Sequence, residues 1–492
     1  MFPRTLASRT FDEADQLSFA RLSGDVNPIH LDPLTARRTN ASSTVAHGVH
    51  AVLWALDKLV ELNLVRDCIN SLKIQFIKFI FVGSAVQLVL REVGDTSIRA
   101  ELICDELVSV TLIVGVGSRR AAHGRAIDGE LDAIAIERPT EFLRLEDLAE
   151  RSGWIDNYAS PQLIEEQFRY ATAYIGAQRT SAVALLSTLV GMVCPGLHSL
   201  FAAFSIEFLE DRAERPGIGF RVRETDERFR MMRMEVFGSG VSGSVQAFLR
   251  WPPVAQASAE NIAKLVAPTE FSGSTALIIG GSRGLGALTA KIIAAGGGRV
   301  IITYATGRDD ASTLAREINV QVENDVCKVL RYDVREDVFS QLAKLNADVT
   351  HLYYFATPQI TRQKTQFFIA SLLDEFIQVY VKAFYDCYRF FDQLKLPLTV
   401  YYPSTVFVES KPPGMAEYSM AKMMGEILCS YMNGRTGHIH VIADRLPRLL
   451  TDQTATLPPL KSADPLEIML PVVRRVQSAP APALSAERTP AI

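Results

Sequence analysis

Near its N-terminus the chain reads Phe19-Ala-Arg-Leu-Ser-Gly-Asp-Val-Asn-Pro-Ile-His-Leu-Asp32, and Ala46-His47-Gly48 follows at the start of a long apolar stretch. The first segment places the carboxylate of Asp25 five residues before the imidazole of His30, with a proline between them that stiffens the turn. An Asp–His pair can hold one water molecule, take its proton and deliver a proton to a neighbouring carbon. The segment therefore predicts an acid–base site on a polar loop.

The second segment ends on a glycine that opens a helix, expected over Gly48–Asn63. The apolar residues of this helix lie on more than one face, so we expect it to be buried on most sides. Amides in the first turn of a helix lack partners within the helix, and no side chain shields the amide of Gly48. This amide is a candidate donor to a developing oxyanion.

These segments together resemble the signature of the MaoC-like (R)-specific enoyl-thioester hydratases, a hotdog family that adds water across trans-2-enoyl thioesters. The likeness runs through Ser23-Gly24-Asp25, Asn27-Pro28-Ile29-His30 and Asp32, and resumes at Ala46-His47-Gly48. The resemblance implies that Asp25 and His30 are the catalytic pair and that Gly48 donates to the thioester carbonyl. It also implies that Asn27 shapes the loop or helps to position water, and that Asp32 is structural.

Two successive regions, residues 1–123 and 124–258, each combine one apolar helix with β-rich runs. In the first, LKIQFIKFIF and LVSVTLIVGV follow the helix; in the second, HSLFAAFSIEFL and GSVQAFLRW follow the helix candidate SAVALLSTLVGMVC. This order predicts a diverged internal duplication. The second region resembles the non-catalytic half of a double hotdog, so the resemblance implies an α+β double hotdog. The second half lacks a GDxNPxH string, so it is expected to be degenerate and to widen the groove for an acyl chain. A separate α+β domain is the alternative.

A linker over residues 259–273 is expected to lead to a C-terminal domain over 274–476, in which strand and helix patterns alternate. Alternation of this kind predicts an α/β Rossmann-type domain with a doubly wound parallel sheet. Its first strand runs into the loop Gly280-Gly-Ser-Arg-Gly-Leu-Gly286, whose glycines let the backbone approach a pyrophosphate at the start of a helix. The Pro- and Ala-rich tail, residues 477–492, is expected to be disordered.

Two arginines near this loop favour NADP(H) over NAD(H). The second strand, RVIITYATGR, ends without the acidic residue that would bind a ribose 2′-hydroxyl, whereas Arg283 lies in the glycine loop and Arg308 just beyond the strand. Guanidinium groups suit a 2′-phosphate. The alternative is that both arginines are merely solvated. Asp333, at the end of the third strand, is expected to contact the adenine.

Further along, Tyr418-Ser-Met-Ala-Lys422 places a phenol and an ammonium group one helical turn apart. The charge of Lys422 is expected to lower the pKa of the Tyr418 phenol, which would then donate a proton to a carbonyl as hydride arrives. Hydroxyl side chains lie just upstream, in YYPSTVF.

Across about residues 270–455 these features resemble the short-chain dehydrogenase/reductase family. The resemblance implies a catalytic hydroxyl about thirteen residues before Tyr418; Thr405 has that spacing, Ser404 is one residue off, and we favour Ser404. Where the family has a proton-relay asparagine the chain has Tyr380, which leaves the turnover rate open. The implied cofactor contacts are Gly280, Ser282, Arg283, Gly284, Leu285, Gly286, Arg308, Asp333, Val334, Ala356, Tyr418, Lys422 and Pro447.

The two predicted activities share an intermediate. An NADPH-dependent reductase converts a 3-oxoacyl thioester to the (R)-3-hydroxyacyl thioester, which an (R)-hydratase interconverts with the trans-2-enoyl thioester. Tethering raises the concentration of this intermediate at the second site. The sequence leaves two alternatives open: a reductase of another ketone whose hotdog part recognises an acyl carrier, and a non-enzymatic scaffold that binds acyl thioesters. It does not distinguish coenzyme A from an acyl carrier protein.

Composition limits the remaining choices. With 492 residues, 48% of them hydrophobic, and a net charge of −4, the chain is expected to form two to four globular domains without a nucleic-acid or membrane partner. Six scattered cysteines without a CxxC pair indicate a reducing compartment and no metal site. The N-terminus shows no signal peptide, so a cytoplasmic location is expected. A monomer and a homodimer are both compatible with the sequence.

One stretch, Ser181–Phe204, is apolar enough to suggest a membrane span. It contains Pro195-Gly196 and His198, and strand-like sequence follows at once. We therefore predict a buried helix that runs into a strand.

Overall fold

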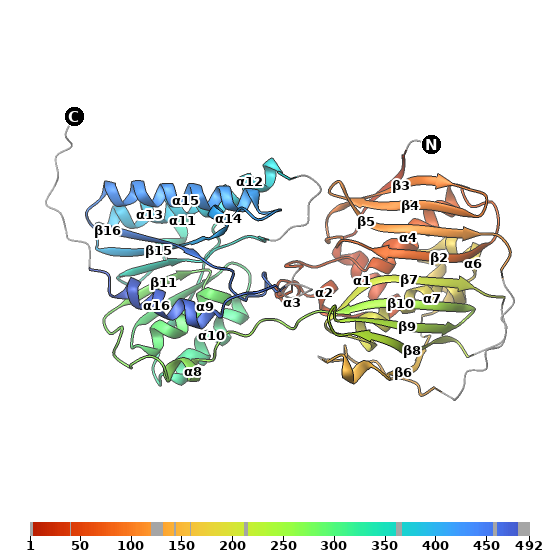
Figure 1. The fold of residues 1–492 in the computed structure, drawn as a ribbon, viewed down its shortest axis with the longest axis horizontal. Coiled ribbons are helices and arrows are strands. Elements are labelled where there is room, and N and C mark those ends of the chain that lie inside the picture. The colour runs from red at the N-terminus through yellow and green to blue at the C-terminus, as the bar shows by residue number, and fades with distance from the viewer. Residues whose placement is uncertain are drawn as a thin grey trace. The chain divides into compact units, whose positions relative to one another are not determined.

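The structure is a computed structural model that describes residues 3–39, 41–119, 131–141, 144–157, 159–210, 215–360, 367–455 and 460–480. The chain folds into two compact units, divided between Pro252 and Pro253 (Figure 1). The expected boundary at residues 123/124 lies outside the described residues. Of the tail expected to be disordered, residues 477–492, Gln477 is instead the last residue of a helix, and residues 481–492 lie outside the described part of the chain.

The first unit is built on one ten-stranded sheet in which every pair of neighbouring strands is antiparallel. Its strand order is β1-β3-β4-β5-β2-β7-β10-β9-β8-β6. The strands are β1 (Arg4–Thr10), β2 (Ile69–Phe76), β3 (Ala85–Val93), β4 (Ser97–Cys104), β5 (Leu107–Val116), β6 (Ser152–Asp156), β7 (Ser199–Phe208), β8 (Gly217–Asp226), β9 (Met231–Gly238) and β10 (Val241–Leu249).

The two halves of this sheet repeat one connection pattern. Read outward from the central β2–β7 pair, the order is β2-β5-β4-β3-β1 on one side and β7-β10-β9-β8-β6 on the other. Each central strand follows a long buried helix, α4 (Gly48–Glu61) before β2 and α7 (Ala177–Thr188) with the π-helix η2 (Leu189–Val193) before β7. One hydrophobic core contains buried residues from both halves.

Shorter helices of the first unit connect these elements. They are α1 (Glu13–Ser23), α2 (Pro28–Leu31), α3 (Pro33–Ala36), the 3₁₀ helix η1 (Glu146–Leu148), α5 (Pro161–Gln167) and α6 (Arg169–Ile175). The stretch Ser181–Phe204 lies in α7, η2 and β7, so the prediction of a buried helix running into a strand is confirmed. Among the described residues, no helix is both long and apolar enough to cross a membrane.

The second unit contains a six-stranded parallel sheet in the order β13-β12-β11-β14-β15-β16. Counted within the unit this order is 3-2-1-4-5-6, the order of the Rossmann fold, which confirms the predicted parallel sheet. The strands are β11 (Thr275–Ile279), β12 (Arg299–Tyr304), β13 (Cys327–Arg331), β14 (His351–Tyr354), β15 (Leu398–Thr405) and β16 (Ile439–Leu446).

Helices cover both faces of the parallel sheet (Figure 1), and each face has its own hydrophobic core. One face carries α8 (Ala259–Ala263), α9 (Gly284–Ala295), α10 (Arg308–Gln321) and α16 (Pro465–Gln477). The other carries α11 (Val338–Leu342), α12 (Ala370–Ile377), the π-helix η3 (Gln378–Lys382), α13 (Ala383–Leu394), α14 (Phe407–Ser410) and α15 (Ala416–Arg435).

The prediction of a linker over residues 259–273 is wrong. This segment forms α8 and a turn, and Ile262, Val266 and Phe271 are buried in the core beside α9. The Lys291 ammonium group on α9 donates to the backbone oxygen of Ala257 (3.2 Å). The apolar residues of the segment recur four or five positions apart, so they lie on one face, which packs into the core of the second unit. The segment therefore belongs to the second unit.

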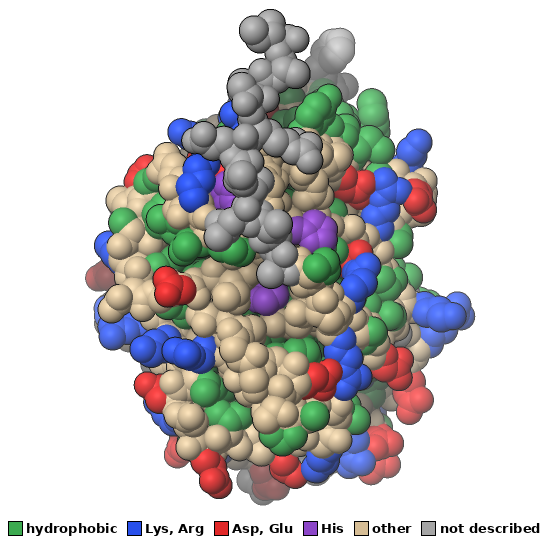
Figure 2. Space-filling model, turned by 90° about the vertical axis from the view of Figure 1, so that its left-hand side faces the viewer, with side chains coloured by type: hydrophobic (Ala, Val, Ile, Leu, Met, Phe, Trp, Pro, Cys, Tyr) green, Lys and Arg blue, Asp and Glu red, His purple; other side chains and the backbone are tan. Residues whose placement is uncertain are grey.

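Charges of both signs are interspersed on the surface. On the face shown in Figure 2, Lys and Arg side chains alternate with Asp and Glu side chains. Ion pairs such as Arg474–Glu270 (2.6 Å) and Arg331–Glu336 (2.6 Å) follow the same mixed pattern, which agrees with a net charge of −4 on 492 residues.

A buried histidine, His50 on α4, contributes to the core of the first unit. Its ring stacks on Phe19 (4.9 Å between centroids, 6° between planes) and lies edge-on to Phe11 and Phe168. Its Nδ1 atom is buried without a hydrogen-bond partner among the described residues. Burial lowers the pKa of His50 to about 3.

We expect His50 to make the first unit sensitive to acid. Between the folded pKa, about 3, and the unfolded value of 6.5, the unfolded chain holds one extra proton, so stability is lost as the pH falls below 6.5. The loss from one such histidine is about 1.4 kcal/mol per pH unit. The unfolding free energy of His50→Phe should therefore depend less steeply on pH than that of the wild type.

The measurement is urea unfolding followed by tryptophan fluorescence between about pH 5 and about pH 8, the range over which histidine titrates. All three tryptophans, Trp54, Trp154 and Trp251, lie in the first unit, so the signal reports on that unit alone. Equal slopes for the wild type and His50→Phe would contradict a neutral, buried His50.

Candidate active sites

The first candidate site forms where α1 ends. Gly24 caps α1 in the left-handed region (φ 81°), and the chain then turns through Asp25. Asn27 caps α2 by accepting from the Ile29 amide, with Pro28 as the first helical residue. These two turns place Asp25 before α2 and His30 within it, so the spacing of the motif brings both side chains to one place.

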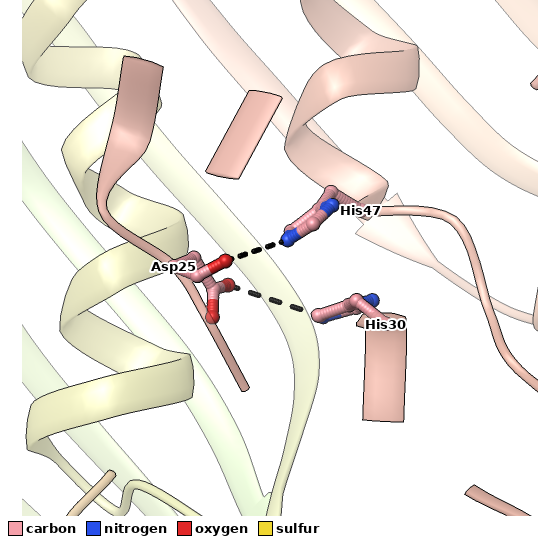
Figure 3. A group of neighbouring side chains, drawn as sticks. All are labelled: Asp25, His30 and His47. Carbon is pink, nitrogen blue, oxygen red and sulfur yellow. Dashed lines mark hydrogen bonds and ion pairs between the residues drawn. The ribbon is translucent and has the colours of Figure 1, made fainter. Parts of the chain in front are cut away.

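The Asp25 carboxylate is almost completely buried, with 1% of the residue exposed. Its Oδ1 accepts from the Asn27 amide (3.1 Å), and its Oδ2 accepts from the Ser187 hydroxyl (2.7 Å). His30 Nε2 lies 3.9 Å from Oδ2, as the dashed line in Figure 3 marks. The structure thus brings the predicted pair together at a distance that one small molecule can bridge.

His30 is oriented by its other ring nitrogen. Nδ1 lies 2.7 Å from the backbone oxygen of Val45, and because a carbonyl only accepts, Nδ1 carries the proton. Neutral His30 therefore presents a lone pair on Nε2 toward Asp25. The His47 ring stacks on His30 (3.9 Å between centroids), and its Nε2 donates to the backbone oxygen of Asp25 (3.0 Å), as Figure 3 shows.

Asp25, His30 and His47 offer ligand atoms within 4.8 Å of one another. The Nε2 atom of His47 is engaged with the Asp25 carbonyl, and the Gln16 side chain accepts from the His47 backbone amide (2.9 Å). A ring nitrogen that donates a hydrogen bond has no lone pair for a metal ion. His47 therefore fits a role in fixing the Asp25 backbone, and the group fits acid–base chemistry.

Burial moves the pKa values of the pair toward each other. It raises the pKa of Asp25, which His30, Ser187 and the Asn27 amide lower in part. It lowers the pKa of His30, which Asp25 and Val45 raise in part and the buried Arg250 lowers further. An acid and a base whose pKa values approach each other exchange a proton at little cost, as general acid–base catalysis requires.

The second half of the first unit supplies part of this site through its helices α7 and η2. The Asn27 side-chain amide donates to the backbone oxygen of Gly191 (2.7 Å) in η2, and Ser187 lies on α7. A Cβ atom added at Gly191 would lie 2.4 Å from Asp25 Oδ1 and 2.6 Å from Oδ2. Sequence reasoning missed Ser187 and Gly191, and a glycine inside an apolar helix was the one signal that pointed to them.

The pair opens into a pocket of about 660 Å³, part of it open to solvent. Gly48 lines the pocket as the first residue of α4, whose N-cap has no side-chain hydrogen bond. Most of the wall is apolar or aromatic. The lining residues are Asp25, Ile29, His30, Val45, Ala46, Gly48, Phe76, Lys78, Phe79, Ile80, Val110, Ser187, Val190, Gly191, Ser199, Leu200 and Phe201.

The second candidate site surrounds the glycine loop between β11 and α9. Gly280 (φ 76°) and Gly284 (φ 56°) occupy the left-handed region, and a Cβ added at Gly286 would lie 2.3 Å from the Gly280 oxygen. A Cβ added at Gly284 would meet nothing within 4 Å. The loop is therefore tight on its inner side and open on its outer side, at the start of α9.

Other predicted cofactor contacts gather at the same edge of the sheet. Asp333 and Val334 follow β13, Ala356 follows β14, and Pro447 follows β16, all beyond the carboxyl ends of parallel strands. This edge is where α/β sheets bind ligands. Ser282 lies in the loop itself, and Leu285 lies in the first turn of α9.

The two arginines differ in their surroundings. Arg283 is the N-cap of α9 and lies 3.7 Å from the Asp452 carboxylate. Arg308 is exposed at the start of α10, just beyond β12. Arg308 is the more accessible of the two guanidinium groups for a phosphate.

The hydroxyl beside Tyr418 is Thr405, which corrects the preference for Ser404. Thr405 lies beside Tyr418 of α15 and lowers the pKa of its phenol, whereas the Ser404 hydroxyl donates to the Glu426 carboxylate. Both residues reach α15, which carries Tyr418 and Glu426, but Ser404 is engaged with Glu426 and Thr405 lies beside Tyr418.

The expectation that Lys422 lowers the pKa of Tyr418 is also wrong. Burial raises the pKa of the Tyr418 phenol, and the nearby Thr405 hydroxyl offsets only part of this effect. Burial lowers the pKa of Lys422 to about 7. Its ammonium group donates to the Pro403 oxygen (2.6 Å) and lies 4.0 Å from the centre of the Tyr380 ring.

Tyr380 lies in the π-helix η3 and is fully buried. Its hydroxyl is 2.5 Å from the Thr357 hydroxyl, and its backbone oxygen accepts from the Tyr402 hydroxyl (3.2 Å). Both polar ends of this residue therefore have protein partners.

Comparison with known proteins places the first part of the chain. Residues 2–112 match the family model described as MaoC like domain, which confirms the resemblance drawn from the Asp25–His30 motif. A curated protein of Escherichia coli (strain K12), the cyclic-di-GMP-binding biofilm dispersal mediator protein, is 31% identical over 117 residues, which cover 19% of this chain and 49% of that protein. The chain thus spans about half the length of that relative.

Solved structures match about two fifths of the chain. A gluconate 5-dehydrogenase from Burkholderia cenocepacia J2315, in complex with NADP and tartrate, is 16% identical with a TM-score of 0.38, over 42% of this chain and 90% of that one. A 3-ketoacyl-(acyl-carrier-protein) reductase from Brucella melitensis, complexed with NADH, is 19% identical with a TM-score of 0.37, over 42% and 92%.

We expect Gly191→Ala to destabilise the first unit. In a helix interior this change ordinarily stabilises a protein by up to about 1 kcal/mol. Here the added methyl group would collide with the Asp25 carboxylate, and forced overpacking costs about 1–3 kcal/mol. In an Asp25→Ala background the cost should disappear. Urea unfolding of the four variants gives the coupling energy, and additive effects would show that Gly191 and Asp25 do not compete for space.

Proposed function

We propose that the chain is a bifunctional enzyme of acyl thioesters. Its first unit would interconvert (R)-3-hydroxyacyl and trans-2-enoyl thioesters, and its second would reduce 3-oxoacyl thioesters with NADPH. The observation that carries the proposal is the buried Asp25–His30 pair, 3.9 Å apart at the wall of an apolar pocket that Gly48 also lines. The match of residues 2–112 to a dehydratase-type family supports the same chemistry.

In hydration, water bound between Asp25 and His30 would add its oxygen to the β-carbon of the enoyl thioester. Between them the two groups take the proton that water loses and deliver one proton to the α-carbon, so no net proton is consumed. Negative charge builds on the thioester oxygen in this step, and the Gly48 amide at the start of α4 is the donor that would stabilise it. Dehydration follows the same steps in reverse.

We propose that the first unit is a double hotdog with one working site. The repeated strand order supports this view, as does the absence of a second GDxNPxH string in the sequence. The second half would still serve catalysis, because its Ser187 holds the Asp25 carboxylate.

The second unit fits NADP(H). The open side of Gly284 leaves room for a pyrophosphate, β12 ends without an acidic residue, and exposed Arg308 follows it. The cofactor would supply the hydride. Tyr418, held by Thr405, would give the proton to the ketone oxygen, and Lys422 lies one helical turn away on the same helix.

An exposed apolar stripe on α15 supports a homodimer formed through the second unit. Met420, Met423, Met424, Ile427 and Tyr431 are each at least 39% exposed and recur at helical spacing.

The coupled reaction is tested with acetoacetyl-CoA and NADPH, with the thioesters analysed by mass spectrometry. We expect the wild type to form 3-hydroxybutyryl-CoA and crotonyl-CoA, because both sites are intact. Asp25→Asn should stop at the hydroxy compound, since it lacks the carboxylate base. Tyr418→Phe should form neither product but still hydrate crotonyl-CoA.

Other outcomes separate the alternatives. NADPH consumption with equal products from the wild type and Asp25→Asn would make the first unit a carrier-recognition module. Hydration of crotonyl-CoA without NADPH oxidation would leave only the first activity. If neither reaction occurs, with coenzyme A or acyl-carrier-protein thioesters, the chain is a binding scaffold.

The choice between Thr405 and Ser404 has its own test. Thr405→Val removes the hydroxyl that contacts Tyr418, so we expect the reductase kcat to fall by at least about 100-fold. Ser404→Ala is the matched control and should cost less than about tenfold, because Ser404 contacts Glu426 and not Tyr418. A larger loss in Ser404→Ala would overturn the assignment.

A further inference from the structure

The pocket of the first unit lies where the two central strands separate. β2 and β7 pair from Ser71 opposite Glu207 to Gln75 opposite Ala203, and the ladder ends there. The next residue of β2 is Phe76, whose side chain lies on the inner face with Ile74 and Leu72. Beyond this point the strands no longer bond to each other, so side chains fill the space between them.

A β-bulge turns an aromatic side chain of β7 into the same space. In the pairing with β10, Gln246 lies opposite Ala203 and Ala247 opposite Phe201, so Ala202 is the extra residue. A bulge shifts the alternation of side chains by one residue. Phe201 therefore shares the inner face with Phe204 and lines the pocket, although the two are an odd number of positions, three, apart in the chain.

The two aromatic rings close one wall of the pocket. The centroids of Phe76 and Phe201 are 4.9 Å apart, a contact distance that leaves no room for a methylene chain between them. Phe204 lies behind both rings, at 6.2 Å from Phe76 and 5.9 Å from Phe201. The ring of Phe76 also packs on the start of α4, because a Cβ added at Gly48 would lie 2.7 Å from its Cε1 atom.

We propose that the Phe76–Phe201 pair limits the acyl chain at this site to short groups. The inference rests on the proposed hydratase function and identifies its substrate class. The reacting carbons must lie beside Asp25, His30 and Gly48, and the acyl chain then runs along the apolar wall that Phe76 and Phe201 complete. A longer chain fits only if the two rings part.

The test compares crotonyl-CoA with trans-2-decenoyl-CoA as substrates of the full-length protein. The wild type should favour crotonyl-CoA. Phe201→Ala should raise kcat/KM for decenoyl-CoA relative to crotonyl-CoA by at least about tenfold, the effect of relieving a clash with one or more methylenes. Phe201→Leu, which keeps more of the core volume, should shift the ratio in the same direction by less.

Phe237→Ala is the matched control, because Phe237 is a partly buried phenylalanine of β9 that packs on Trp154 and is not among the residues that line the pocket. Its ratio should stay near that of the wild type. Efficient hydration of decenoyl-CoA by the wild type, or an equal shift in Phe237→Ala, would overturn the assignment of chain length to the ring pair.

Calorimetry with butyryl-CoA and decanoyl-CoA separates this inference from the proposed function. If no thioester is hydrated but Phe201→Ala still gains affinity for decanoyl-CoA over butyryl-CoA, the hydratase proposal fails and the chain-length assignment stands. Hydration of crotonyl-CoA with unchanged ratios in both Phe201 variants leaves the function standing and overturns the assignment. If the protein neither hydrates nor binds either acyl-CoA, both are overturned.

Discussion

The burial of one carboxylate, that of Asp25, constrains the whole first unit. A charge removed from water is costly unless hydrogen bonds replace its solvent. Here they come from the Asn27 amide within the motif and from the Ser187 hydroxyl, 162 residues away along the chain. Gly191 leaves the space in which the carboxylate sits. The site exists only when α7 and η2 of the second half pack against the motif of the first.

Features that depend on residues close together in the sequence could be predicted. The Asp25–His30 spacing, the glycine loop and the buried stretch Ser181–Phe204 depend on residues near one another in sequence, and the structure places them as expected. Contacts across the chain were not predictable in this way. No pattern near Ser187 points to Asp25, and the choice between Ser404 and Thr405 depends on which side chain of α15, Glu426 or Tyr418, each hydroxyl reaches. The segment over residues 259–273, which was expected to be a linker, forms α8 and a turn because its apolar residues pack beside α9.

In the second unit, burial has a larger effect than charge on the pKa values of Tyr418 and Lys422, the predicted catalytic pair. Lys422 is enclosed by tyrosine rings and holds a backbone oxygen, so its pKa falls to about 7 and its charge has little effect on Tyr418. Tyr380 takes part in this enclosure, because the centre of its ring lies 4.0 Å from the ammonium group. The spacing of Tyr418 and Lys422 in the sequence does not reveal a ring that another helix contributes.

The repeated strand order of the first unit also has an evolutionary consequence. In a symmetric pair of identical halves, each substitution appears in both halves. A substitution that improves the pocket wall facing one catalytic loop therefore also changes the half that carries that loop. In this chain the loop and the facing wall are encoded separately. The bulge at Ala202 and the aromatic ring that it presents can change without touching Asp25 or His30. Such an asymmetric gene can diversify its choice of substrate while its reaction stays the same.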